Sequence, residues 1–89
     1  MLIYWTDVAR AAILEMKEVL IRKHSPWRAQ DVFISLFEQV KQLADFPETG
    51  QLYRQGGIEH VRQLIVDDYR ILYYVGEQRL DILTINYQV

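Results

Sequence analysis

The chain has 89 residues, a length that suits a single hydrophobic core, so we expect one domain over residues 1–89. About half of the residues (51%) are hydrophobic and 25% are charged, which excludes a disordered chain. The formal charge of -2 gives no overall attraction to nucleic acid, and the absence of cysteine excludes disulfide frameworks, thiolate nucleophiles and sulfur-ligated zinc.

The sequence contains no segment typical of a membrane or secreted protein. No apolar run approaches the roughly 20 residues needed to span a bilayer. The apolar start, residues 1–5, is soon followed by Asp7 and is too short for a signal peptide. The lack of cysteine favours a reducing compartment. We therefore expect a cytoplasmic protein with no membrane partner.

Two amphipathic helices are predicted behind a short first strand. Residues 2–6 favour a strand because they are apolar, aromatic or β-branched. Thr6 suits an N-cap, and apolar residues then recur at three- and four-residue spacing as far as His24. Ser25-Pro26 ends this helix and opens a second one, whose broad apolar stripe stops before Pro47. The short connection predicts an antiparallel helix hairpin.

The second half of the chain predicts three strands. Residues 51–57 read as a loop, and β-branched and aromatic residues then gather in 60–66, 69–75 and 80–87, separated by short turns. The order β-α-α-β-β-β places the helix hairpin on a small antiparallel sheet. We therefore predict an α+β fold.

The facing of the strands depends on the turn at residues 67–69, which we interpret as a three-residue hairpin loop. The face that meets the helices then holds Val61, Gln63, Ile65, Ile71, Tyr73, Val75, Leu80, Ile82 and Thr84. The opposite face holds Arg62, Leu64, Val66, Arg70, Leu72, Tyr74, Leu83, Ile85 and Tyr87. A register shifted by one residue is the alternative, and it would move every side chain across the sheet.

The opposite face is too apolar to stay bare in water. A sheet with one solvated side alternates apolar and polar residues, whereas this face holds about as many large apolar side chains as charged ones. Both predicted helices already cover the other side. We therefore expect the cover to be a partner protein or a second copy of the chain.

Several short segments carry a family resemblance. They are Tyr4-Trp5-Thr6 with Ala9, Phe46-Pro47-Glu48-Thr49-Gly50, Val61 to Val66, Tyr69 to Val75, and Leu80 to Ile85. In this order and spacing they resemble the RelE/ParE family of toxins from bacterial toxin–antitoxin modules, over nearly the whole chain. The resemblance implies two helices on a twisted antiparallel sheet, and a cognate antitoxin that wraps a segment around the toxin.

The resemblance allows two kinds of activity. RelE-like members cut messenger RNA on the ribosome, which requires cations beside the scissile phosphate and a group that moves the proton of the attacking 2′-hydroxyl. In this chain those roles would fall on Arg62, Arg70 and Tyr87. ParE-like members bind and poison DNA gyrase without chemistry of their own. Neither kind implies a cofactor.

The residues favour the ParE-like kind. The paired lysines of the RelE-like strand are not matched by residues 61–64, and a negative net charge is unfavourable at a ribosomal site full of phosphate. We therefore expect a gyrase-binding toxin neutralised by an antitoxin, assembled as a homodimer or as a hetero-oligomer with that antitoxin. The alternative is a ribosome-dependent mRNA endoribonuclease. ParE-like chains often continue into a basic tail and this sequence ends at Val89, so a non-toxic antitoxin-binding domain is a further alternative.

The expected partner-binding residues are those of the second face, namely Arg62, Leu64, Arg70, Leu72, Tyr74, Leu83, Ile85 and Tyr87. Arg70 also has a structural interpretation, as a cation paired with an aspartate at position 67, 68 or 81. Trp5 and Trp27 are expected to anchor the helix hairpin against the first strand. His24 and His60 lack the spacing of metal ligands, so no metal site is expected.

Overall fold

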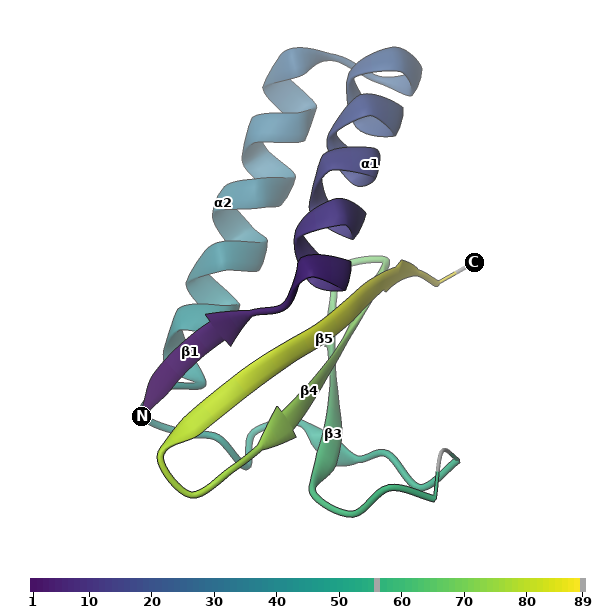
Figure 1. Ribbon diagram of the computed structural model, residues 1–89. Helices are drawn as coiled ribbons and strands as arrows, with labels where there is room; N and C mark the ends of the chain where they lie inside the picture. The colour runs from purple at the N-terminus through teal and green to yellow at the C-terminus, as the bar shows by residue number, and fades with distance from the viewer. Residues whose placement is uncertain (56, 89) are drawn as a thin grey trace.

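The computed structural model describes residues 1–55 and 57–88. A helix hairpin lies on one face of a five-stranded sheet (Figure 1). The elements are β1 (Leu2–Trp5), α1 (Asp7–Lys23), α2 (Pro26–Gln42), β2 (Gln51–Leu52), β3 (Val61–Val66), β4 (Tyr69–Val75) and β5 (Arg79–Tyr87). The predicted α+β fold class is confirmed. The short β2 lies inside the predicted loop over 51–57, which is described except at Gly56.

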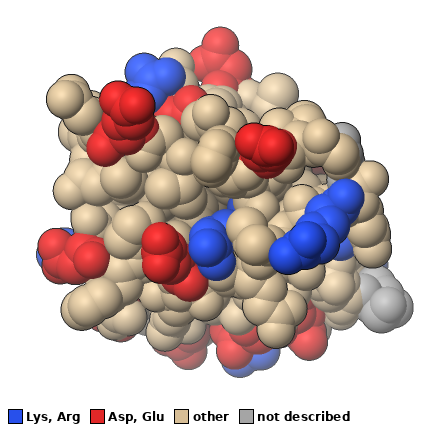
Figure 2. All heavy atoms as spheres, turned by 90° about the horizontal axis from the view of Figure 1, so that it is seen from below, with Lys and Arg blue, Asp and Glu red and all other residues tan. Residues whose placement is uncertain are grey.

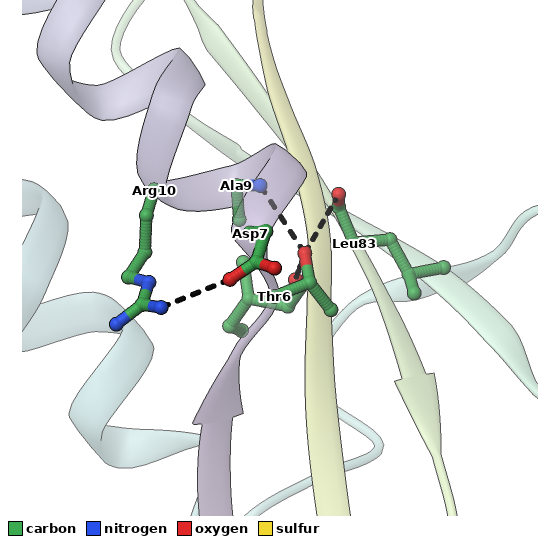
Figure 3. Close-up of polar contacts among 6 residues, drawn as sticks. Thr6, Asp7, Ala9, Arg10 and Leu83 are labelled. Atoms are coloured by element: carbon green, nitrogen blue, oxygen red, sulfur yellow. Dashed lines mark hydrogen bonds and ion pairs between the residues drawn. The ribbon is translucent and has the colours of Figure 1, made fainter.

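Both helices begin at the residues that the sequence indicates. The Thr6 hydroxyl oxygen accepts the Ala9 N–H, and the Ser25 hydroxyl oxygen accepts the Arg28 N–H, so each cap satisfies a donor that the helix leaves free. The Thr6 hydroxyl also donates to the carbonyl oxygen of Ile82 on β5 at 2.7 Å. The same hydroxyl lies 3.2 Å from the carbonyl oxygen of Leu83 (Figure 3). The start of α1 is therefore fastened to the sheet.

The strand order is β1-β5-β4-β3-β2. The strands β3, β4 and β5 pair antiparallel in chain order, as predicted. The short β2, which was not predicted, pairs antiparallel with β3, and β1 pairs parallel with β5. A parallel pair needs a long crossover connection, and the helix hairpin with the strands that follow it supplies one. The first and last strands of the sequence are therefore neighbours in the sheet.

The core lies between the hairpin and the sheet. Its largest fully buried side chains are Tyr73, Leu36, Leu43, Ile71, Leu80, Ile82 and Val40. Trp5 joins this core through an edge contact with Phe37, with 5.4 Å between ring centroids, as expected for an anchor of the hairpin. The same expectation for Trp27 is wrong. Trp27 is 78% exposed and lies in the first turn of α2. The connection between the two helices is at the end of the hairpin away from the sheet (Figure 1).

The turn between β3 and β4 has two residues, not three. Val66 pairs directly with Tyr69, and Asp67 closes the turn with a φ of 52°, a left-handed conformation that aspartate tolerates. This shifts β3 by one residue relative to the prediction. The predicted facing of β3 is therefore wrong, and Arg62, Leu64 and Val66 lie on the face that meets the helices.

A β-bulge in β5 reverses the facing of its second half. Ile82 and Thr84 pair with consecutive residues of β4, which leaves Leu83 as the extra residue. Beyond the bulge, Ile85 and Tyr87 lie on the helix face, and Ile85 is only 6% exposed. Their predicted place on the opposite face is wrong, as is that of Thr84 on the helix face. An inserted bulge residue changes the alternation without leaving a signal in the hydrophobic pattern.

Candidate functional site

The candidate site is the face of the sheet directed away from the helices, which we call the outer face. Cross-strand pairing and alternation place on it Leu2, Tyr4, Val61, Gln63, Ile65, Arg70, Leu72, Tyr74, Arg79, Asp81, Thr84 and Asn86. Arg70, Leu72 and Tyr74 therefore share this face as the sequence predicted. Leu83 lies at the bulge, and the remaining predicted partner-binding residues are on the helix side.

The outer face keeps a large apolar content after the register is corrected. Leu2 is 68% exposed, Ile65 is 53% exposed and Tyr4 is 43% exposed. Leu72 and Tyr74 are half-buried. Seen from below the view of Figure 1, the surface consists mostly of uncharged residues, with scattered acidic and basic side chains, several of them next to one another (Figure 2). These exposed apolar side chains therefore still favour coverage of the outer face by another protein.

Two charges of the outer face neutralise each other. The Arg79 Nε lies 2.7 Å from Asp81 Oδ1, and the Arg79 guanidinium also stacks 4.7 Å from the ring centroid of Tyr4. Asp81 and Tyr4 are cross-strand partners, so the sheet itself brings the three side chains together. This corner of the outer face therefore carries little net charge.

Arg70 has a different environment. Its guanidinium carbon lies 5.5 Å from the ring centroid of Tyr53, and its Nε is buried without a hydrogen-bond partner among the described residues. Arg70 takes part in none of the ion pairs formed within residues 1–55 and 57–88. The interpretation of Arg70 as a structural cation paired with an aspartate is therefore wrong.

Arg62 serves the segment that follows α2. Its Nη1 donates to the carbonyl oxygen of Gly50 at 2.7 Å and lies 3.4 Å from that of Glu48. The same segment is held by Tyr73, whose hydroxyl donates to Pro47 O and accepts from Gly50 N–H, both at 2.8 Å. Burial raises the pKa of the Tyr73 phenol, against the opposing effects of the Gly50 hydrogen bond and the Arg62 charge. Sequence reasoning missed this structural role of Arg62.

Tyr87 lies at the far end of the helix face. Its ring packs against Tyr69 with 5.5 Å between centroids, and it is 60% exposed. Both rings border a cavity of about 340 Å³ between α1 and the end of β5, which is also lined by Met16 and His24. Burial raises the pKa of Tyr69, and the nearby Tyr87 and Asp68 act in the same direction.

Comparison with known proteins identifies the family of the chain. The family model described as "ParE toxin of type II toxin-antitoxin system, parDE" matches residues 3–88. The chain belongs to this family. A solved structure titled "Chromosomal ParDE TA system from P. aeruginosa" is similar, with 22% sequence identity, a TM-score of 0.84, and coverage of 100% of this chain and 97% of that chain. At that identity the likeness concerns the fold. No curated protein matches the chain.

In this ParE-family toxin the three residues considered for RNA cleavage are separated. Arg70 lies on the outer face, while Arg62 and Tyr87 lie on the helix face. Arg62 and Tyr87 are themselves far apart, because their partners on β4 are four residues from each other, about 13 Å along a strand. A general base must come within about 3 Å of the proton it moves. The described structure does not bring these side chains to one such point.

Residues 1–55 and 57–88 contain no group of three or more histidine, aspartate or glutamate side chains placed to hold a metal ion. Neither helix described in the structure has the length and apolar character needed to cross a membrane.

Proposed function

We propose that this ParE-family chain acts by binding DNA gyrase, without chemistry of its own, and that a cognate antitoxin neutralises it in the cytoplasm. The observation that supports a binding mode of action is the separation of Arg62, Arg70 and Tyr87. Arg62 is engaged by backbone carbonyl groups, and Tyr87 packs on Tyr69 at the other end of the sheet. Membership of the ParE toxin family supports gyrase as the target.

The electrostatics of the chain point the same way. Its formal charge is -2, and the outer face pairs Arg79 with Asp81. A protein that enters a phosphate-rich ribosomal site gains most of its affinity from several cations that neutralise phosphates. The outer face offers one unpaired cation among the described residues, Arg70. This composition suits recognition of a protein surface better than recognition of RNA.

The antitoxin is supported by the family and by the outer face. A ParE toxin belongs to a toxin–antitoxin pair, so the chain requires a partner that silences it. The outer face presents exposed apolar side chains at Leu2, Tyr4 and Ile65 that favour coverage by another protein. We propose that antitoxin binding covers at least part of this face.

The test is a gyrase supercoiling assay with the purified chain. We expect supercoiling to fall as the chain is added and to recover when an equimolar amount of the antitoxin is present. A ribosome-dependent cleavage assay with the same preparation is expected to give no cuts. Unchanged supercoiling at excess chain would contradict the proposal. Codon-positioned cuts that vanish with Arg70→Ala would establish the endoribonuclease alternative, and normal growth under strong expression would establish the non-toxic one.

A further inference from the structure

The distribution of charge on the outer face leaves one cation without a partner. Three charged side chains lie on the described strands of this face, Arg70, Arg79 and Asp81. Arg79 and Asp81 form an ion pair with each other. Arg70 forms no ion pair within the described residues, and it lies on β4, which is central in the sheet.

The surroundings of Arg70 hold its guanidinium in place but leave its hydrogen-bonding capacity partly unused. The side chain stacks over Tyr53, and its cross-strand neighbours are Ile65 and Asn86, neither of which carries charge. Its Nε is shielded from water and has no acceptor among the described residues. A stacked guanidinium has already lost much of its rotational freedom, so a ligand that binds it avoids part of the entropic cost.

We propose that Arg70 is the anchor for a carboxylate of the antitoxin, presented by an antitoxin segment that lies across the outer face with apolar residues on either side of the acid. This inference rests on the proposed toxin–antitoxin function. The guanidinium of an arginine receives a carboxylate through two parallel hydrogen bonds. The neighbouring apolar side chains, above all Ile65 and Leu72, exclude water and strengthen the pair. Arginine with flanking aromatic residues is also the typical composition of an interface hot spot.

Charge complementarity selects an acidic protein segment over a nucleic acid. A nucleic-acid backbone is bound by several cations in a row, whereas this face has a single one surrounded by apolar groups. One acid between apolar residues is the complement of that pattern. We assign the acid to the antitoxin because the chain belongs to a family of paired toxins and antitoxins, and because an exposed apolar face most needs a stable cover.

The test measures the affinity between the chain and its cognate antitoxin by isothermal titration calorimetry. The variants are Arg70→Gln, Arg70→Lys and the control Arg22→Gln, which removes the same charge from an exposed position on α1. We expect Arg70→Gln to weaken binding by at least about 30-fold, as loss of one partner of a buried charge pair does. The affinity of Arg70→Lys should lie between those of the wild type and Arg70→Gln, because an ammonium keeps the charge but lacks the planar, forked donors of a guanidinium. Arg22→Gln should stay within about threefold of the wild type.

The outcomes separate this inference from the function on which it rests. Thermal unfolding first establishes that each variant is folded. If Arg70→Gln binds the antitoxin as tightly as Arg22→Gln does, the inference is overturned while the antitoxin interaction stands. If Arg70→Gln keeps its antitoxin affinity and loses gyrase inhibition, the carboxylate that Arg70 binds is one of gyrase, and the inference also fails. If the wild-type chain does not bind the antitoxin, the proposed function is contradicted, and so is the inference that rests on it.

Discussion

The hydroxyl oxygen of Tyr73 accepts the backbone N–H of Gly50 at a distance of 2.8 Å. The same hydroxyl donates to the carbonyl oxygen of Pro47, also at 2.8 Å. Tyr73 is fully buried on β4, in the middle of the sheet. The segment that follows α2 is therefore fastened to the centre of the core, in addition to its own local hydrogen bonds.

Replacing Tyr73 by phenylalanine removes both hydrogen bonds and leaves the buried Gly50 N–H without a partner. We expect Tyr73→Phe to lower the free energy of unfolding by about 1–3 kcal/mol, measured by urea denaturation. The control is Tyr74→Phe, whose hydroxyl makes no hydrogen bond within the described part of the chain. That variant should change stability by less than about 0.5 kcal/mol. Equal effects of the two substitutions would contradict the assignment.

Gly50 has no room for a side chain. A Cβ at this position would lie 2.5 Å from the Gln63 carbonyl oxygen and 2.6 Å from the Tyr73 hydroxyl oxygen. We expect Gly50→Ala to lower the free energy of unfolding by about 1–3 kcal/mol, as overpacking of a core does. In the double variant with Tyr73→Phe the hydroxyl contact is gone. The loss of stability in the double variant should therefore be smaller than the sum of the losses in the two single variants. Full additivity in denaturant unfolding would show that the two sites are uncoupled.

The two helix caps make a matched pair with different tertiary roles. Ser25 accepts one N–H of its helix, whereas Thr6 accepts one and also donates to Ile82 O on β5. We expect Ser25→Ala to cost about 1 kcal/mol of stability and Thr6→Ala to cost more, about 2 kcal/mol. Thr6→Ser keeps the hydroxyl and should lower the free energy of unfolding by less than either alanine substitution does. A larger loss for Ser25→Ala would contradict the role of Thr6 in joining α1 to the sheet.

The buried tyrosines predict a loss of stability at high pH. Burial raises the pKa of both Tyr69 and Tyr73 above the ordinary value of 10.0. The folded state then holds these protons where the unfolded state has released them, so the free energy of unfolding falls as the pH rises above about 10. Below that pH these two groups do not make the free energy of unfolding depend on pH. Absorbance titration of the phenolates, with denaturant unfolding at several pH values, measures both effects, and Tyr73→Phe should reduce the slope.

The two arginines of the neighbouring strands β3 and β4 should respond differently to loss of charge. Arg62 donates to the Gly50 carbonyl oxygen and supports the fold, whereas the Nε of Arg70 has no hydrogen-bond partner and Arg70 forms no ion pair among the described residues. We expect Arg62→Gln to lower the free energy of unfolding by about 1 kcal/mol and Arg70→Gln to change it by less than about 0.5 kcal/mol. The opposite ranking in urea denaturation would show that Arg70 is the structural residue.

The local pattern of the sequence was sufficient for the elements of this protein. Helical spacing, the caps at Thr6 and Ser25, and the break at Pro47 are short-range properties, and each predicted helix or strand appears within a few residues of its expected bounds. The resemblance to RelE/ParE toxins also depended on local motifs, and the family match over residues 3–88 confirms it.

The tertiary structure decided which side chains share a face. A two-residue turn at Asp67 and a bulge at Leu83 each shift the alternation by one position, and both depend on strand pairing that no local pattern records. These shifts moved Arg62 into contact with a backbone loop and left Arg70 on the other side of the sheet. The sequence thus determined the elements and the family, whereas cross-strand geometry determined the candidate site.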